Sequence, residues 1–275
     1  MPAAYVRSET AAAVAALGAA LPIVLARQGA DDVRPKAPRD IVTGTDLASQ
    51  AAIEHVLRER FPDYGFVGEE GQDASGNPAG PASGRYWLVD PLCGTANFAA
   101  RLPLFAVNIA LVEAGRVTIG AVGDGTTGDV YVAERGFGAW RLSADGPERL
   151  RASGACGLVS LDPNLGGPDD LRPFGQAFAM RVLAAGQWDV RMFATTLTLA
   201  YLAGGKVAAA VYAASGPRVH LAAGLLLAHE SGAMVTSERG TDWTLDDDVY
   251  VVAAGQDLQR ELLAIARSVV AELRS

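Results

Sequence analysis

The hydrophobic and polar positions before residue 62 follow the spacing of two helices. The first is an uncharged, Ala-rich run of 16 residues from Ala11 to Ala26, with Pro22 inside it. It is shorter than the roughly 18 apolar residues of a membrane span, so we predict a largely buried helix. The second helix follows Thr45 and Asp46, whose short polar side chains can cap its start, and Pro62 ends it.

From Phe66 onward the pattern changes to short apolar runs separated by glycine turns. Connections as short as Glu113-Ala114-Gly115 indicate antiparallel hairpins. We therefore predict one meandering antiparallel sheet over residues 66–142, covered by the two N-terminal helices. Its strands are predicted at Phe66–Gly68, Tyr86–Asp90, Phe105–Glu113, Val117–Asp124, Val130–Glu134 and Ala139–Leu142.

After Arg151 the predicted strands and helices alternate, which is typical of an α/β unit with its own core. The fold class is therefore α/β, of the α+β kind, with units over residues 1–150 and 151–275. The first unit is expected to carry most of the active site. Strands are predicted near Leu158, at Val207–Tyr212 and near Val249–Ala254, and helices near 170–185, near 196–204, at Leu221–Ser231 and at Leu258–Leu273.

Composition and charge exclude several classes of function. The chain of 275 residues has 23 Lys and Arg against 31 Asp and Glu, which gives a net charge of −8. Without a basic cluster this acidic chain has no electrostatic basis for binding a phosphate backbone. We therefore expect a small polar substrate, and neither a nucleic acid nor a membrane as partner. Two cysteines are too few for a disulfide scaffold and fit a reducing cytoplasm.

Acidic residues and a glycine turn follow two of the predicted strands. Gly68-Glu69-Glu70 ends one apolar run, and residues 87–91 end another with Asp90-Pro91. Carboxylates at strand ends suit a hard cation, although ordinary polar loops have the same composition. The segment from Gly94 to Phe98 then has the pattern of a tight turn that opens a short helix, whose free N–H groups can hold a phosphate.

Four segments together resemble the inositol monophosphatase family. Residues 87–98, WLVDPLCGTANF, are similar to its first signature, which usually reads Asp-Pro-hydrophobic-Asp-Gly-Thr-x-Asn-Phe. The others agree in order and spacing, and the resemblance runs from the first predicted helix to the last. They are DIVTGTD at 40–46, FVGEE at 66–70 and HLAAGLLLAHESGA at 220–233.

The resemblance implies a layered α-β-α-β-α sandwich, which fits the predicted meander followed by an α/β unit. It also implies a Mg²⁺-dependent, Li⁺-sensitive phosphomonoesterase acting on a small phosphorylated molecule. Members of the family use inositol phosphates, fructose 1,6-bisphosphate, histidinol phosphate or phosphoadenosine phosphate. Many members are dimers, so we expect a homodimer.

Several family positions can be carried over to this sequence by the resemblance. Glu69, Asp90 and the Leu92 carbonyl match the ligands of the first metal. Asp46 and Thr95 match the pair that orients the attacking water. The resemblance therefore implies a complete first-metal site and a complete water-activating pair.

Further matches concern the phosphate and its surroundings. Gly94, Thr95 and Ala96 match the turn whose backbone N–H groups bind phosphate. Lys36, one of only two lysines in the chain, falls where many members place a lysine near the site. Glu70 matches the second acidic residue of its signature, for which a structural, hydrogen-bonding role is as plausible as a chemical one.

Two departures from the family pattern fall on the second metal. Cys93 replaces the second carboxylate of the first signature, and Val219-His220 replaces a Trp-Asp pair whose Asp is a ligand. Thiol and imidazole are poor ligands for Mg²⁺, which is a hard ion. If the fold is as implied, Cys93 and His220 lie within a few ångströms of each other.

Two more departures concern the substrate. Ala194-Thr195 stands where the family usually has Gly-Ser. Residues 207–215 lack the acidic residues that commonly contact inositol hydroxyls. These differences disfavour inositol phosphate as the substrate.

The sequence leaves three functions open. The first is a phosphomonoesterase that uses the remaining metal site of Glu69, Asp90 and Leu92, with one Mg²⁺. The second is a repurposed site, in which His220 lowers the pKa of the Cys93 thiol for nucleophilic acyl or group transfer, or in which both join Asp90 and Glu69 to bind Zn²⁺. The third is a catalytically silent protein that needs no metal and uses the phosphate pocket, or only its dimer surface, for binding.

The other scarce residues have structural interpretations. Cys156 lies near the start of a predicted strand and is expected to be a small buried residue. His55 and His229 are expected at the surface or hydrogen-bonded, and Trp188 in a core near a strand. Lys206 follows two glycines and is interpreted as a cation at a turn or a helix C-terminus.

Overall fold

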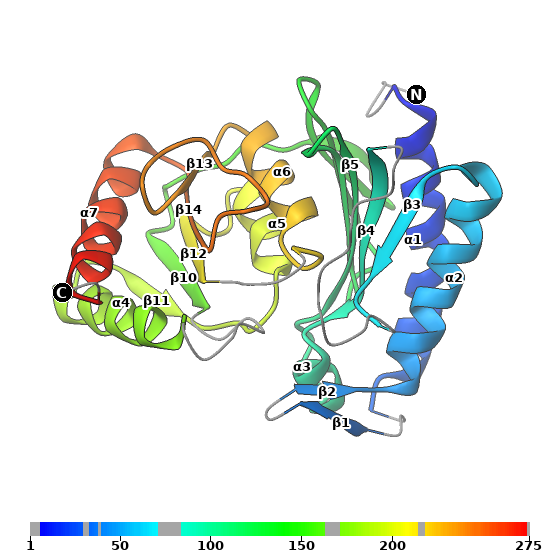
Figure 1. Ribbon diagram of the computed structural model, residues 1–275, viewed down its shortest axis with the longest axis horizontal. Coiled ribbons are helices and arrows are strands. Elements are labelled where there is room, and N and C mark those ends of the chain that lie inside the picture. The colour runs from blue at the N-terminus through cyan, green and yellow to red at the C-terminus, as the bar shows by residue number, and fades with distance from the viewer. Residues whose placement is uncertain are drawn as a thin grey trace.

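The chain folds into alternating layers of helices and sheets, seen edge-on in Figure 1. The computed structural model describes residues 6–29, 33–37, 40–70, 84–162, 171–213 and 218–273. A seven-stranded and a five-stranded sheet enclose one pair of helices, and two other pairs cover their outer faces. The α-β-α-β-α sandwich is confirmed. In order across the molecule the pairs are α1 (Ser8–Arg27) with α2 (Gly44–Arg60), α5 (Leu197–Ala203) with α6 (Ala222–Glu230), and α4 (Arg172–Ala185) with α7 (Gln256–Leu273).

The larger sheet is the predicted meander, with its strands side by side in chain order. All neighbouring pairs are antiparallel except the first, which is parallel and joined by the long connection over residues 69–84. The parallel pair and the last strand are not predicted by the sequence. The strands are β3 (Gly65–Gly68), β4 (Arg85–Cys93), β5 (Ala106–Glu113), β6 (Arg116–Asp124), β7 (Val130–Glu134), β8 (Gly138–Ser143) and β9 (Gly146–Arg149).

The smaller sheet has the order β11-β10-β12-β14-β13 and mixes parallel with antiparallel pairs. The strand predicted from Val207 begins two residues later, at Ala209, and two short strands of this sheet are not predicted. Its strands are β10 (Leu158–Asp162), β11 (Asp189–Arg191), β12 (Ala209–Ala213), β13 (Met234–Ser237) and β14 (Val249–Ala253). Three further elements lie outside both sheets: a hairpin of β1 (Arg34–Ala37) and β2 (Asp40–Val42), and the short helix α3 (Thr95–Ala99).

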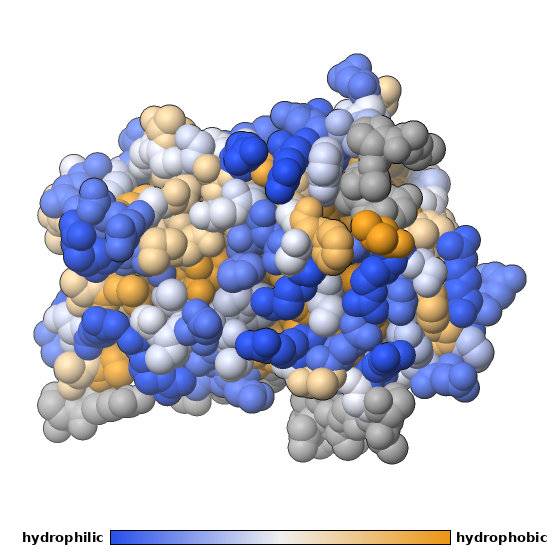
Figure 2. Space-filling model, turned by 90° about the horizontal axis from the view of Figure 1, so that it is seen from above, coloured by the Kyte–Doolittle hydropathy of each residue, from blue (hydrophilic) through white to orange (hydrophobic). Residues whose placement is uncertain are grey.

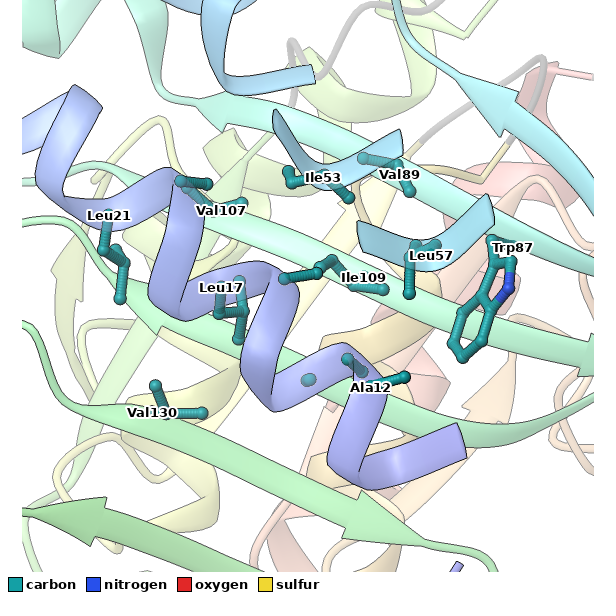
Figure 3. Close-up of a cluster of buried hydrophobic side chains, with 14 of the residues drawn as sticks. Ala12, Leu17, Leu21, Ile53, Leu57, Trp87, Val89, Val107, Ile109 and Val130 are labelled. Carbon is teal, nitrogen blue, oxygen red and sulfur yellow. The ribbon is translucent and has the colours of Figure 1, made fainter. Parts of the chain in front are cut away.

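The first helix is a core helix of this fold. By length and composition α1 could cross a membrane. Its Ala12, Leu17 and Leu21, however, belong to a fully packed cluster with Ile53 of α2 and Ile109 of β5 (Figure 3). The predicted burial of the first helix is therefore confirmed for the face of α1 that packs on the sheet, whereas other residues, Leu25 among them, are exposed.

The surface carries isolated apolar side chains. Figure 2 shows that apolar residues on the upper face are interrupted by polar ones. Single exposed apolar side chains are ordinary on protein surfaces and need no functional explanation. Exposed large examples on different elements are Leu47, Leu102, Phe137, Met180 and Met192.

Strand β6 and helix α6 approach so closely that one glycine is required between them. A Cβ on Gly120 would lie 2.6 Å from the backbone oxygen of Ala223. We expect Gly120→Ala to lower the free energy of unfolding by about 1–3 kcal/mol, because the helix backbone must move away from the sheet. Urea unfolding followed by circular dichroism measures this loss.

The matched control is Gly18→Ala in α1, where a Cβ would meet no atom within 4 Å. Alanine is the better helix former, so this variant should be neutral or more stable by up to about 1 kcal/mol. Unchanged stability of the Gly120 variant would contradict the close approach of α6 to the sheet.

Candidate active site

A bulge in β4 places Asp90 and Cys93 on the same face of the larger sheet. Asp90 pairs with Asn108 of β5 and Cys93 with Ala106, so β4 advances three residues while β5 advances two. Successive side chains of a regular strand alternate between faces, and the extra residue restores the common direction. The Ser49 hydroxyl of α2 donates to the Pro91 carbonyl inside the bulge, at 2.8 Å. The bulge therefore fixes the two side chains relative to each other.

Asp46 and Thr95 come together at the start of α2. Asp46 Oδ1 accepts a hydrogen bond of 3.2 Å from Thr95 Oγ1, which also lies 2.9 Å from the Leu92 carbonyl. Asp46 Oδ2 accepts from the backbone N–H of Thr43 at 2.9 Å, which closes a capping box. Thr43 is thus the N-cap, and the predicted cap at Thr45-Asp46 is wrong by two residues. Burial raises the pKa of Asp46 to about 6, although the bonds from Thr43 oppose this.

Gly94 forms the turn that opens α3. Its φ of 88° lies in the left-handed region, and a Cβ would lie 2.8 Å from the Leu104 carbonyl. Thr95 and Ala96 follow as the first helical residues, whose N–H groups have no partner within the helix. The turn is therefore built as the sequence predicts for a phosphate cradle.

Lys36 reaches the site from strand β1. Its Nζ lies 3.2 Å from Glu69 Oε1 and 3.0 Å from Glu70 Oε1. Burial lowers the pKa of Lys36, but the Glu69 and Glu70 carboxylates raise it by more, so the side chain stays a cation. The backbone of Glu70 is held by a pair of hydrogen bonds with the Gln50 amide, at 2.7 and 2.9 Å, which supports a structural role.

His220 faces two carboxylates from the turn before α6. Its Nδ1 lies 2.8 Å from Asp90 Oδ2 and 3.8 Å from Glu69 Oε2. Burial lowers the pKa of His220, but Glu69 and Asp90 raise it well above its usual value. Burial also raises the pKa of Glu69 to about 8, against the lowering effect of His220 and Lys36. The two acidic side chains of the first-metal position thus lie beside the side chains of Lys36 and His220.

Cys93 is buried, and its side chain is hydrogen-bonded to Thr196. Its Sγ lies 3.0 Å from Thr196 Oγ1 and accepts a 3.2 Å hydrogen bond from the Thr196 N–H. Burial raises the pKa of the Cys93 thiol and Asp90 raises it further, while His220 lowers it. The net direction disfavours the alternative in which His220 lowers the pKa of this thiol enough to make it a nucleophile. A thiol only 3% exposed is also poorly placed to attack a substrate.

The structure gathers all the candidate residues named from the sequence into one region. The ligand atoms of Asp90, Cys93 and His220 lie within 4.8 Å of one another. Sequence reasoning missed Thr196 and Asn108, whose amide donates to both Asp90 Oδ2 and Thr196 Oγ1 at 3.1 Å. A lone amide in the apolar strand β5 is a signal that could have found Asn108.

Residues set aside as structural behave mostly as expected. His55 and His229 are exposed. Trp188 is partly buried against the core between the smaller sheet and helices α4 and α7. Lys206 lies in the turn after α5, with its ammonium over the ring of Tyr201. The expectation for Cys156 is wrong: this cysteine is exposed, because β10 begins two residues later and leaves it in a turn.

Ala194 marks the departure from the Gly-Ser pattern beside the site. It has a φ of 52°, a left-handed conformation that is uncommon for residues with a Cβ. The Asn97 amide donates to the neighbouring Phe193 carbonyl at 2.8 Å and so ties this segment to α3. Position 194, where the family pattern has glycine, thus has a backbone conformation that suits glycine although it carries alanine.

Comparisons with known proteins agree with this geometry. The model of the inositol monophosphatase family matches residues 5–271. The inositol-1-monophosphatase of Mesorhizobium japonicum is 34% identical over 230 residues, which are 83% of each chain. The Nus factor SuhB of Pasteurella multocida is 41% identical over 104 residues, and this alignment spans 38% of each chain.

A solved structure agrees as well. The IMPase of Thermotoga maritima superposes with a TM-score of 0.79 at 27% sequence identity, covering 94% of this chain and 97% of that one. The sequence is thus similar to this family over nearly its whole length. The order of the layers agrees with this similarity. The chain belongs to the inositol monophosphatase family.

Proposed function

We propose that this protein hydrolyses a small phosphomonoester, adding water across the P–O bond to give inorganic phosphate and an alcohol. The single observation that carries the proposal is the Asp46–Thr95 pair, 3.2 Å apart beside the Gly94 turn. Asp46 supplies a carboxylate that can accept the proton of a water held by the Thr95 hydroxyl. The first-turn N–H groups of Thr95 and Ala96 would hold the phosphate.

One metal position fits Mg²⁺, which members of this family generally use. Glu69, Asp90 and the Leu92 carbonyl offer oxygen atoms alone, and oxygen is what a hard cation requires. The Asp90 side chain is held by the Leu92 N–H, at 3.1 Å from Oδ1. An ion bound there would polarise the phosphate and favour ionisation of the attacking water. Lys36, bound to Glu69, would stand beside that ion as a second positive charge.

The second metal position does not fit Mg²⁺. Cys93 and His220 supply sulfur and nitrogen where a hard ion needs oxygen, and Zn²⁺ is the alternative that such a donor set suits. Burial of Cys93 and its raised pKa weaken the nucleophile hypothesis. The intact Asp46–Thr95 pair weakens the hypothesis of a silent binding protein that needs no metal.

The substrate of our proposal is not inositol phosphate. Residues 209–213 form the apolar strand β12, and the sequence has no carboxylate within 207–215 to contact inositol hydroxyls. We further propose a cytoplasmic homodimer that binds no nucleic acid. Both cysteines are free thiols, which supports a reducing compartment, and family membership supports the dimer.

Phosphate release from a panel of phosphomonoesters tests the function. The purified chain is incubated with sugar phosphates, histidinol phosphate, phosphoadenosine phosphate and inositol phosphate, with chelator, Mg²⁺, Mn²⁺ or Zn²⁺. We expect cation-dependent turnover of at least one compound, and slower turnover of inositol phosphate. If no cation gives turnover while a phosphate ligand still raises the unfolding temperature, the protein is a binding homologue and the proposal fails.

A further inference from the structure

The Asp90–Cys93–His220 cluster offers one oxygen, one sulfur and one nitrogen to a single point. These ligand atoms lie within 4.8 Å of one another, and Glu69 Oε2 lies 3.8 Å from His220 Nδ1. We propose that the cluster binds one thiophilic divalent cation of the zinc class, with Cys93 as a thiolate ligand. Binding is independent of the hydrolase activity proposed above, because an ion can be held here whether or not a phosphomonoester is turned over.

The size of the cluster suits such an ion. Zinc binds sulfur at about 2.3 Å and nitrogen or oxygen at about 2.0–2.2 Å, so its tetrahedral ligand atoms lie roughly 3.4 Å apart. The 2.8 Å contact between His220 Nδ1 and Asp90 Oδ2 must therefore widen slightly, and the Cys93 sulfur, within 4.8 Å of a ligand atom of each, must reach a similar separation. Small side-chain rotations achieve both, because Cys93 and Asp90 already point to the same side of the bulged strand.

A chain of hydrogen bonds directs two donors at the Cys93 sulfur. Both amide hydrogens of Asn108 are used, since its Nδ2 donates to Asp90 Oδ2 and to Thr196 Oγ1, each at 3.1 Å. The Thr196 oxygen thus accepts from Asn108, and its own hydrogen is available for Cys93 Sγ, 3.0 Å away. The Thr196 N–H donates to the same sulfur at 3.2 Å. Two donors on one sulfur favour a bound thiolate.

The same amide therefore orients two of the three ligands. Hydrogen-bonded partners behind the ligands of a metal are known to fix ligand orientation and to raise affinity. The third ligand, His220, follows a turn that is held by Arg218. The Arg218 side chain is buried and donates to the Asp247 carbonyl at 2.7 Å and to the Tyr250 hydroxyl at 3.1 Å. Hydrogen bonds thus hold the Asp90 and Cys93 side chains, and the buried Arg218 side chain holds the turn that carries His220.

Metal binding is tested on the full chain after removal of bound metal by chelator and dialysis. The chain is titrated with Zn²⁺ alone and, as a spectroscopic probe, with Co²⁺ alone. We expect one Zn²⁺ per chain to remain through gel filtration in excess Mg²⁺, measured by mass spectrometry. Co²⁺ should give a thiolate-to-cobalt charge-transfer band.

Two cysteine variants provide a matched pair. Cys93→Ser should abolish the charge-transfer band, whereas Cys156→Ser, which removes the exposed cysteine, should keep it. Thr196→Val should keep the band and weaken Zn²⁺ binding about 10- to 100-fold, because the sulfur loses one donor. His220→Gln, a change at a partly exposed side chain, should weaken Zn²⁺ binding without removing the band.

The site is overturned if the wild-type chain retains no Zn²⁺ or if the band survives Cys93→Ser. Loss of the band in Cys156→Ser would overturn it as well. Circular dichroism shows whether Cys93→Ser is folded. If it is not, unchanged Zn²⁺ affinity in His220→Gln refutes the proposal by itself. A failed phosphatase panel with a retained Zn²⁺ and an intact band would refute the proposed hydrolase while supporting this site.

Discussion

Asp46→Asn is expected to reduce turnover of the preferred phosphomonoester by about a hundred- to a thousandfold. The substitution keeps the size of the side chain but removes the carboxylate that faces Thr95 Oγ1 at 3.2 Å. An amide can no longer accept a proton from water. Steady-state kinetics with the compound identified in the panel measure the loss, which should fall on kcat more than on KM.

Dependence on pH separates this effect from a merely structural one. Burial raises the pKa of Asp46 to about 6, so a base at this position is lost as the pH falls through that value. Turnover by the wild type should therefore rise as the pH increases through about 6, and a bound cation would shift this rise to lower pH. The residual activity of the Asn variant should show no such rise. A rise that persists unchanged in Asp46→Asn would show that another group is the base.

Thr43→Ala is the control for damage to the start of α2. It removes the hydroxyl of the capping box, which we expect to cost about 1 kcal/mol of stability, and leaves the Asp46 carboxylate in place. Turnover should fall by less than about tenfold, since the base and its partner Thr95 are retained. An equal loss in both variants would mean that Asp46 acts through the helix and not through its carboxylate.

The double variant Cys93→Asp with His220→Asp is expected to raise Mg²⁺-dependent turnover by about a hundredfold. Two carboxylates would replace the sulfur and nitrogen donors at the second metal position, next to Asp90 and Glu69. Oxygen ligands suit Mg²⁺, and a second ion would stabilise the leaving alkoxide. The phosphate-release assay at several Mg²⁺ concentrations measures the gain, and unchanged Mg²⁺-dependent turnover would contradict it.

The same variant should become dependent on Mg²⁺ for its stability. Without an ion, four carboxylates share one buried region after the His220 cation is lost, and like charges this close are unfavourable. A cation that binds the folded chain alone raises the unfolding temperature by mass action. We therefore expect a larger Mg²⁺-induced rise in unfolding temperature than in the wild type. Each single variant serves as a control, because it changes one donor and leaves the other.

The sequence predicted the larger sheet well from β5 onward, because glycine turns separate those strands and their order follows directly from short connections. It failed at the start of α2, where Thr43, Thr45 and Asp46 are all residues that can cap a helix. Only the extended backbone of Thr43, with a φ of −120°, decides between them. Local composition could not supply that information.

The candidate site could be assembled from the family resemblance, but its surroundings could not. Thr196 lies 103 residues from Cys93 along the chain, and nothing local marks it as the partner of that sulfur. The raised pKa of the Cys93 thiol could not be foreseen either, because burial outweighs the lowering effect of His220 and burial is a property of the packed layers. Cys156 was misplaced for the same kind of reason, since it lies in the turn just before β10 and its exposure depends on how that turn packs.

The bulge in β4 also bears on how the chemistry of this site can change. The direction in which Asp90 and Cys93 point is set by the number of residues between two backbone pairings, and not by the side chains themselves. One donor can therefore be exchanged for another, carboxylate for thiol, with the strand unaltered. Deleting one residue of the bulge would instead turn position 93 toward α1 and α2. The scaffold thus tolerates new ligands at fixed points while it forbids changes in chain length between them.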